Sequence, residues 1–153
     1  MTTPAGLQHP SGALLRRVRH LRSRKGREAE GLFLAEGPQA VREALRTRHV
    51  TALFVGDDHL DRADEHVQAA ADAGVPAYLV REDVLASLAD TVTPQGVVAV
   101  CRSEPVTLDE ALAGARLVVV CAQIRDPGNL GTVIRCADAF GADAVLVTRE
   151  SVE

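Results

Sequence analysis

The chain has 153 residues, enough for one ordinary domain or two small ones. Hydrophobic residues make up 46% of it and aromatic residues only 3%, so Ala, Val and Leu must build the core. No run approaches the roughly 18–20 apolar residues of a membrane span, and the N-terminus lacks the pattern of a secretory signal. Cys101, Cys121 and Cys136 have no metal-like spacing and are expected to be reduced thiols of a cytoplasmic protein.

The net charge of −4 is unevenly distributed. Residues 1–49 hold ten Lys/Arg against four Asp/Glu, whereas residues 50–153 hold seven against seventeen. Seven cations fall within twelve positions of the basic part: Arg16, Arg17, Arg19, Arg22, Arg24, Lys25 and Arg27. This density can neutralise several phosphates and predicts contact with a nucleic acid. Leu14, Leu15, Val18 and Leu21 form an apolar stripe at helical spacing, so a solvated basic helix face is the compatible alternative.

Helices and strands alternate along the first hundred residues. The pattern predicts helices at 13–25, 38–48, 61–74 and 82–89, and strands at 32–37, 51–56, 76–80 and 97–101. Such alternation predicts an α/β layered domain with a largely parallel sheet. The next segment, 102–115, mixes Pro, Gly and charge, and we expect a linker carrying a short helix.

A second α/β unit begins with a strand at 116–122 and continues through a turn and a helix to a strand at 144–148. This βαβ opening raises the possibility of a dinucleotide-binding domain. However, the turn QIRDPGNLG lacks both G-x-G-x-x-G and the G-x-x-x-x-G-K-[ST] of a phosphate-binding loop. In this turn, Asp126 and the Pro-Gly after it predict a tight reversal, and Asn129 predicts the helix N-cap.

The helix after this turn has two distinct faces. Leu130, Val133, Ile134, Ala137 and Gly141 line one face. Gly131, Arg135 and Asp138 fall on another face, three or four residues apart. From these patterns alone, Arg135 would be the surface ion-pair partner of Asp138.

The same stretch resembles the first sequence motif of the SpoU/TrmH-type RNA 2′-O-ribose methyltransferases, members of the SPOUT superfamily. That motif is essentially D-P-x-N-x-G-x-x-x-R-x-A-x-A-F-G. The chain supplies its residues in register: Asp126, Pro127, Asn129, Gly131, Arg135, Ala137, Ala139, Phe140 and Gly141. The preceding part resembles the N-terminal substrate-binding domain of these enzymes, through LRSRKGREAEGLFLAEGPQAVREAL and TPQGVVAV.

The resemblance implies three segments: an RNA substrate-binding domain at 12–103, a linker at 104–115, and the start of a methyltransferase domain at 116–153. The first domain is expected to have an α/β/α fold like certain ribosomal proteins. The second would be Rossmann-like, with the trefoil knot of SPOUT enzymes. The family's later motifs, which hold the cofactor, are absent from the 153 residues. We therefore interpret the chain as an N-terminal portion, inactive alone, with its cofactor-binding residues beyond Glu153.

The resemblance also implies a chemistry. It is transfer of a methyl group from S-adenosylmethionine to a ribose 2′-hydroxyl of RNA, most commonly large-subunit rRNA, in a homodimer without a metal. Arg135 and Asn129 are the implied catalytic residues. Because a guanidinium stays protonated in ordinary settings, Arg135 either removes the hydroxyl proton or positions the ribose and phosphate, and both remain open. A tRNA substrate and a non-catalytic RNA-binding module are the alternatives.

The loop at 90–96, DTVTPQG, lies between a predicted helix and a predicted strand. At such a sheet edge, polar groups can face the bases of an RNA. We expect Gln95 to be exposed and close to bound RNA, with a plain turn as the alternative.

Overall fold

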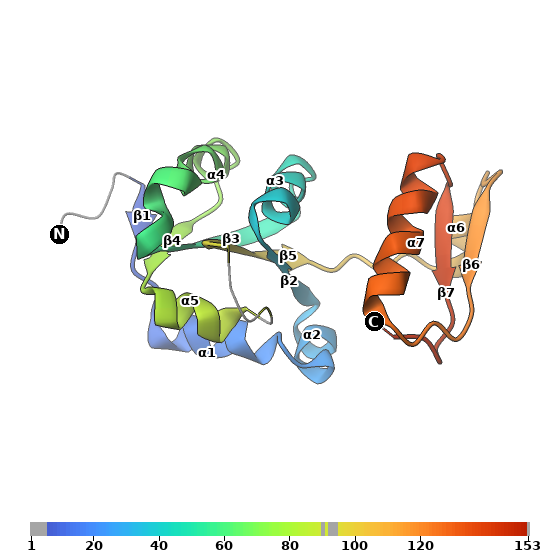
Figure 1. Ribbon diagram of the computed structural model, residues 1–153, viewed down its shortest axis with the longest axis horizontal. Coiled ribbons are helices and arrows are strands. Elements are labelled where there is room, and N and C mark those ends of the chain that lie inside the picture. The colour runs from blue at the N-terminus through green and yellow to red at the C-terminus, as the bar shows by residue number, and fades with distance from the viewer. Residues whose placement is uncertain (1–5, 90, 92–94, 153) are drawn as a thin grey trace. The chain divides into compact units, whose positions relative to one another are not determined.

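The computed structural model describes residues 6–89, 91 and 95–152. The chain divides into two compact units, Met1–Glu104 and Pro105–Glu153, each with its own sheet (Figure 1). Among the described residues, none of the helices combines the length and the apolar character required to cross a membrane.

The first unit is a five-stranded sheet with helices on both faces (Figure 1). Its strands are β1 (Leu7–Gln8), β2 (Leu32–Glu36), β3 (Val50–Gly56), β4 (Ala77–Val80) and β5 (Val97–Arg102). Its helices are α1 (Gly12–His20), α2 (Arg24–Glu30), α3 (Pro38–Arg46), the 3-10 turn η1 (Asp57–His59), α4 (Leu60–Asp72) and α5 (Glu82–Leu88). The expected α/β/α architecture is confirmed.

The strand order is β1-β4-β3-β5-β2. The strand β4 pairs in parallel with β1 and β3, whereas β5 is antiparallel to both β3 and β2. The sheet is therefore mixed, and the prediction of a largely parallel sheet is wrong. Central strands are buried on both faces whatever their direction, so their apolar runs contain no information about direction.

Two apolar layers hold the helices on the sheet. On one face, α3 and α4 contribute Val41, Leu45, Ala63 and Ala70 to a cluster of buried side chains. On the other face, α1 and α5 contribute Val18, Leu21, Leu85 and Leu88 to a second cluster. Leu14 and Leu15 pack against this second cluster, so the apolar stripe predicted for α1 is confirmed.

The basic segment forms two helices, and the prediction of one continuous helix at 13–25 is wrong. Ser23 Oγ accepts a hydrogen bond from the Gly26 backbone N–H (3.0 Å) and caps α2. The Arg27 guanidinium donates to the carbonyl oxygens of the two residues before Ser23, at 3.3 and 3.2 Å. Because a serine side chain can bond to the backbone two or three residues ahead, it starts a new helix where an apolar pattern would continue the old one.

The second unit contains α6 (Leu108–Leu112), β6 (Val118–Cys121), α7 (Pro127–Ala139) and β7 (Ala144–Val147). The strands β6 and β7 are parallel, and α7 connects them, so the predicted βαβ unit is confirmed. The carboxylate of Asp143 anchors the start of β6 by accepting the backbone N–H groups of Leu117 (2.9 Å) and Arg116 (2.8 Å). Both hydrogen bonds stabilise the ionised carboxylate and lower the pKa of Asp143. The hydrogen bond from Leu117 has the larger effect, and that from Arg116 the smaller.

Candidate functional site

The turn between β6 and α7 is closed by Asp126. Its Oδ1 accepts the backbone N–H of Asn129 at 2.7 Å, and its own backbone is extended, as an N-cap requires. Pro127 occupies the first helical position, where the missing N–H costs nothing. The prediction that Asn129 is the N-cap is therefore wrong. Asn129 lies in the first turn of α7, and its exposed side chain is not needed to start the helix.

The side chain of Arg135 folds back along α7 toward the start of the helix. Its Nη2 donates to Thr132 Oγ1 (3.1 Å), and that hydroxyl donates to the carbonyl oxygen of Gly128 (2.9 Å). A Cβ atom at Gly131 would lie 3.4 Å from Arg135 Nη1, so a larger residue there would crowd the guanidinium. Among the described ion pairs, none joins Arg135 to Asp138, and the hydrogen bond to Thr132 takes the place of that predicted pair.

Hydrogen bonds tie the loop after β6 to the loop after β7. The backbone N–H of Gln123 donates to Thr148 Oγ1 (3.2 Å), and that of Ile124 to Ser151 Oγ (3.1 Å). The backbone N–H of Val152 donates to the Ile124 carbonyl (2.7 Å). Both loops follow the carboxyl ends of parallel strands, where α/β proteins commonly bind ligands. Sequence reasoning missed these contacts, and their signal is the two hydroxyl residues that follow the strand β7, Thr148 and Ser151.

Only part of the predicted apolar face of α7 is buried. Leu130 and Ala137 are buried, but Ile134 is 44% exposed and Phe140 is 82% exposed. A cavity of about 560 Å³ runs along this side of the unit. It is lined by Leu117, Val119, Thr132, Val133, Cys136, Ala137, Phe140 and Ala142. Ile134 is exposed because the two described strands of this unit offer too little sheet to cover the whole helix face.

Arg17 and Arg24, both predicted to bind RNA, form ion pairs with glutamates of α2. Arg17 Nε lies 2.6 Å from Glu30 Oε2, and Arg24 Nε lies 2.9 Å from Glu28 Oε1. The arginine side chains are 57% and 63% exposed. Exposed pairs of this kind contribute little to stability, so phosphates can compete for these guanidinium groups.

The other five cations of the segment differ in their surroundings. Arg19 and Arg22 lie against α5: Arg19 donates to Ser87 Oγ (2.9 Å) and Arg22 to the Ser87 carbonyl (3.5 Å). Arg16 and Lys25 are exposed. Arg27 is half-buried, and its guanidinium supports the break between α1 and α2.

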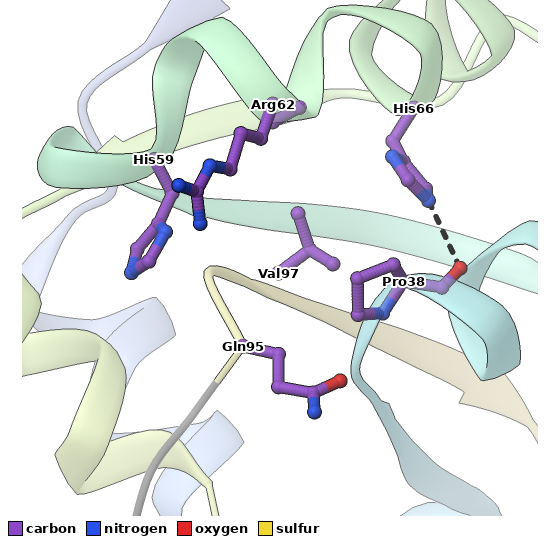
Figure 2. A pocket seen from close by; sticks show the side chains of 7 residues that line it. Pro38, His59, Arg62, His66, Gln95 and Val97 are labelled. Carbon is purple, nitrogen blue, oxygen red and sulfur yellow. Dashed lines mark hydrogen bonds between the residues drawn. The ribbon is translucent and has the colours of Figure 1, made fainter.

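Gln95 is exposed, as predicted, whereas Thr93 and Pro94 of the same loop lie outside the described residues. The side chain of Gln95 lines a cavity of about 370 Å³ that sequence reasoning did not identify (Figure 2). Two histidines and an arginine distant in sequence, His59, His66 and Arg62, line it as well. These residues carry no local motif, so only the folded chain brings them together.

Two further groups in the first unit carry side chains that could take part in chemistry, an acidic cluster and a buried thiol. Asp57, Asp58 and Glu82 each place one carboxylate oxygen within 4.8 Å of the others, but Asp57 Oδ1 accepts the Glu82 backbone N–H (3.1 Å) and so serves the start of α5. We assign no metal to them. Burial raises the pKa of the Cys101 thiol to about 11, so this cysteine is not a nucleophile at neutral pH.

An α/β/α unit with a basic helical segment is followed in this chain by a βαβ unit whose helix starts at D-P-G-N and carries Arg135. Residues 13–99 match the MRM3-like substrate binding domain, and residues 116–153 match the SpoU rRNA Methylase family. The chain belongs to this family of SpoU-type RNA methyltransferases with an MRM3-like substrate-binding domain.

Named relatives agree with this assignment. The chain is 35% identical to the 23S rRNA (guanosine(2553)-2′-O)-methyltransferase RlmP of Bacillus subtilis (strain 168), over 83% of this chain and 48% of that protein. It is 29% identical to the mitochondrial rRNA methyltransferase 3 of Homo sapiens, over 87% of this chain and 32% of that protein. The crystal structure of an AdoMet-bound rRNA methyltransferase from Sinorhizobium meliloti superimposes with a TM-score of 0.78 at 25% identity, covering 97% of this chain and 57% of that one. The chain spans about half the length of the first of these relatives.

Proposed function

We propose that the protein carrying this chain is a cytoplasmic, homodimeric RNA 2′-O-ribose methyltransferase that uses S-adenosylmethionine and acts on large-subunit rRNA. One observation carries the proposal: residues 13–99 match an MRM3-like substrate binding domain, and residues 116–153 match the SpoU rRNA Methylase family. In this proposal, residues 12–103 bind the RNA, residues 104–115 are a linker, and residues 116–153 belong to the catalytic domain.

We assign to Arg135 the positioning of the target ribose. A guanidinium is a permanent donor, so it can hold a phosphate oxygen or the 2′-oxygen far more readily than it can accept a proton. Arg135 is turned toward the start of α7, where the helix dipole also favours an anion. The side chain of Asn129, exposed in the first turn of α7, can donate and accept at the same place.

S-adenosylmethionine would supply the methyl group: its sulfonium S–CH3 bond would break as the ribose 2′-oxygen bonds to that carbon, S-adenosylhomocysteine would leave, and the 2′-hydroxyl proton would pass to solvent. The cavity that the described residues form along α7 does not fit this cofactor. Its lining includes one hydroxyl, that of Thr132, and otherwise apolar groups and the thiol of Cys136. The charged amino and carboxylate groups of the cofactor would be costly to bury there without polar partners. We therefore assign the described residues of this unit to positioning the target ribose, and not to binding the cofactor.

We further propose that RNA phosphates contact the exposed cations of α1, of α2 and of the turn between them. These are Arg16, Arg17, Arg19, Arg22, Arg24 and Lys25, with Arg27 supporting the helix break between them. The segment carries a dense positive charge, while the rest of the chain is acidic overall. This asymmetry would orient the RNA toward α1 and α2.

The test uses the polypeptide encoded by the complete gene, with methyl-labelled S-adenosylmethionine and rRNA or tRNA lacking the modification. A 2′-O-methyl group blocks alkaline cleavage of the following phosphodiester. We expect label in alkali-resistant dinucleotides from large-subunit rRNA. Label in the mononucleotides that alkali releases would show that a base is methylated instead of a ribose. Label in tRNA would assign tRNA as the substrate. Binding of RNA without methyl transfer would support the alternative of a non-catalytic RNA-binding module.

A further inference from the structure

One end of the five-stranded sheet gathers the starts of three helices. The strands β2 and β3 end there, β5 begins there, and α3, α4 and α5 all start at that edge. Between the starts of α3 and α4 lies the cavity of about 370 Å³ (Figure 2). Its size is at the lower end of ligand pockets, which run from roughly 300 to 1,000 Å³.

The lining of this cavity separates into an apolar part and a polar part. Pro38, Ala63 and Val97 provide apolar surface. His59, Arg62 and Gln95 provide an imidazole, a guanidinium and a carboxamide from two separate segments of the chain (Figure 2). Apolar surface combined with a few directional polar groups suits a hydrogen-bonding ligand with apolar faces, such as a nucleobase.

Two glycines make room for the polar side chains. Gly37 and Gly96 both have left-handed backbones, with φ of 85° and 83°. A Cβ at Gly37 would lie 3.1 Å from the Gln95 side-chain oxygen, and a Cβ at Gly96 would lie 2.5 Å from His59 Cβ. The two glycines therefore allow Gln95 and His59 to stand at the same cavity.

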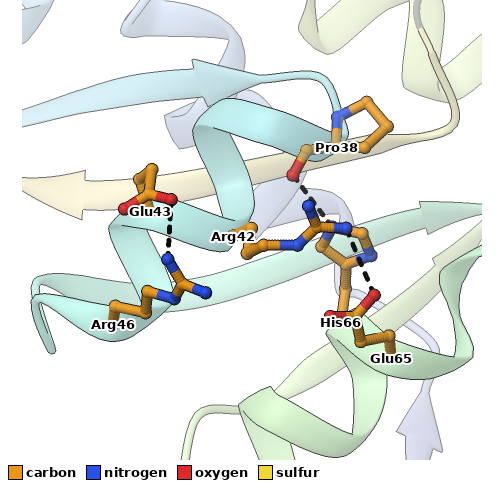
Figure 3. Close-up of polar contacts among 6 residues, drawn as sticks. All are labelled: Pro38, Arg42, Glu43, Arg46, Glu65 and His66. Atoms are coloured by element: carbon orange, nitrogen blue, oxygen red, sulfur yellow. Dashed lines mark hydrogen bonds and ion pairs between the residues drawn. The ribbon is translucent and has the colours of Figure 1, made fainter.

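Polar contacts join α3 and α4 at the wall of this cavity. His66 is only 4% exposed, and its Nε2 donates to the Pro38 carbonyl at 2.9 Å. Arg42 Nη2 and Glu65 Oε2 form an ion pair at 3.2 Å, joining the same two helices beside this histidine (Figure 3). His66 Nδ1 is buried with no hydrogen-bond partner within the described residues. A buried polar atom left unpaired is costly in a wall whose only task is packing, and it is more readily understood at a binding site.

We propose that this cavity binds one unstacked base of single-stranded RNA. The apolar surface would receive the face of the base, the Gln95 amide would donate to and accept from its edge, and Arg62 would stack on it or hold the adjacent phosphate. Among the acids near this set, Glu82 places its Oε2 3.8 Å from His59 Nε2. This inference rests on the proposed RNA substrate and adds the place at which the substrate-binding domain holds an RNA base.

The experiment measures binding of the 153-residue chain to fluorescently labelled single-stranded oligoribonucleotides: oligo(A), oligo(C), oligo(U) and an abasic oligomer of equal length. Gln95→Ala and Arg62→Ala are each expected to weaken binding of at least one base-containing oligomer by about tenfold, the loss typical of one stacked or paired base. Binding of the abasic oligomer should change by less than twofold with Gln95→Ala. Arg46→Ala is the matched control, because Arg46 is an exposed arginine of α3 paired with Glu43 and absent from the cavity lining.

Equal weakening of abasic and base-containing oligomers by Gln95→Ala would show contact with the sugar-phosphate chain alone and would overturn the proposal. Unchanged binding with both variants would overturn it too. Circular dichroism melts of each variant show that the fold is retained. Methyl transfer by the complete gene product is measured separately, so a failure of the enzymatic assignment is distinguishable from a failure of the base pocket.

Discussion

The carboxylate of Asp126 accepts the backbone N–H of Asn129 at 2.7 Å, so the residue that starts α7 is distinct from the exposed amide one turn later. Asp126→Ala is expected to lower the free energy of unfolding of α7 by about 1 kcal/mol, the usual cost of a lost N-cap. Asn129→Ala should leave that stability within about 0.5 kcal/mol, because its side chain does not cap the helix. Hydrogen exchange of the α7 amides measures both, and faster exchange with Asn129→Ala would contradict the assignment of the cap.

Arg135 is held over Gly131 by its hydrogen bond to Thr132. In the complete gene product, Arg135→Ala is expected to reduce single-turnover methyl transfer by two or more orders of magnitude. A misplaced ribose loses the geometry that transfer requires, while the exposed arginine contributes little to folding. Labelled methyl incorporated into RNA gives the rate, and a thermal melt checks the fold.

The matched control for Arg135 is another exposed arginine of the same unit, Arg116→Ala, which lies just before β6, at the opposite end of the strands, and should transfer normally. Arg135→Lys keeps the charge but loses the planar fork, so an intermediate rate would favour positioning over charge alone. If Arg135→Ala transferred at nearly the unmodified rate, the arginine would be an ordinary surface residue.

The cations of α1 and α2 predict a strong dependence of RNA binding on salt. Replacing Arg22, Arg24 and Lys25 by Gln should reduce the slope of log affinity against log salt by up to about three, one counterion for each lost phosphate contact. Replacing Arg46, Arg48 and Arg102 by Gln removes the same charge from exposed positions outside α1 and α2 and should change the slope much less. Filter-binding titrations with rRNA fragments measure both slopes. An equal effect of the two triple variants would contradict a role specific to α1 and α2.

Gly26 is buried at the start of α2 and lies against the backbone of His20. A Cβ atom there would overlap the His20 carbonyl oxygen, so Gly26→Ala must displace α2 and is expected to cost about 1–3 kcal/mol. Gly12→Ala is the control, because its Cβ would meet only the end of the Arg16 side chain at 3.6 Å. Urea unfolding followed by circular dichroism compares the two. Equal stabilities would show that α2 adjusts freely.

Much of this fold could be predicted from the sequence, because the residues that a helix or strand buries recur along the chain with the period of that element. The apolar stripe of α1 and the βαβ order of the second unit both follow from such periods. Local chemistry proved harder to predict where two signals competed. Ser23 started a helix within an apolar pattern, and Asp126, not Asn129, took the cap because Pro127 fits directly behind it.

The candidate sites divide in the same way. Arg135 and Asn129 lie in one contiguous motif and could be identified from the sequence, and so could the exposure of Gln95. The cavity beside Gln95 could not, because His59 and His66 reach it only through the pairing of distant strands. The direction of the strands could not be predicted either. The strands β3 and β5 are buried on both faces, and such apolar runs are the same for parallel and antiparallel strands.

The position of β5 in the sheet has a consequence for synthesis on the ribosome. The strand β2, complete at Glu36, pairs only with β5 within the described sheet, and β5 ends at Arg102. At translation speeds of about 5–20 residues per second, β2 waits on the order of ten seconds before its partner has been made. Until then the nascent chain can pair only β1, β4 and β3, leaving the edge of β3 open. The substrate-binding domain therefore closes late, when its last strand inserts between two strands already made.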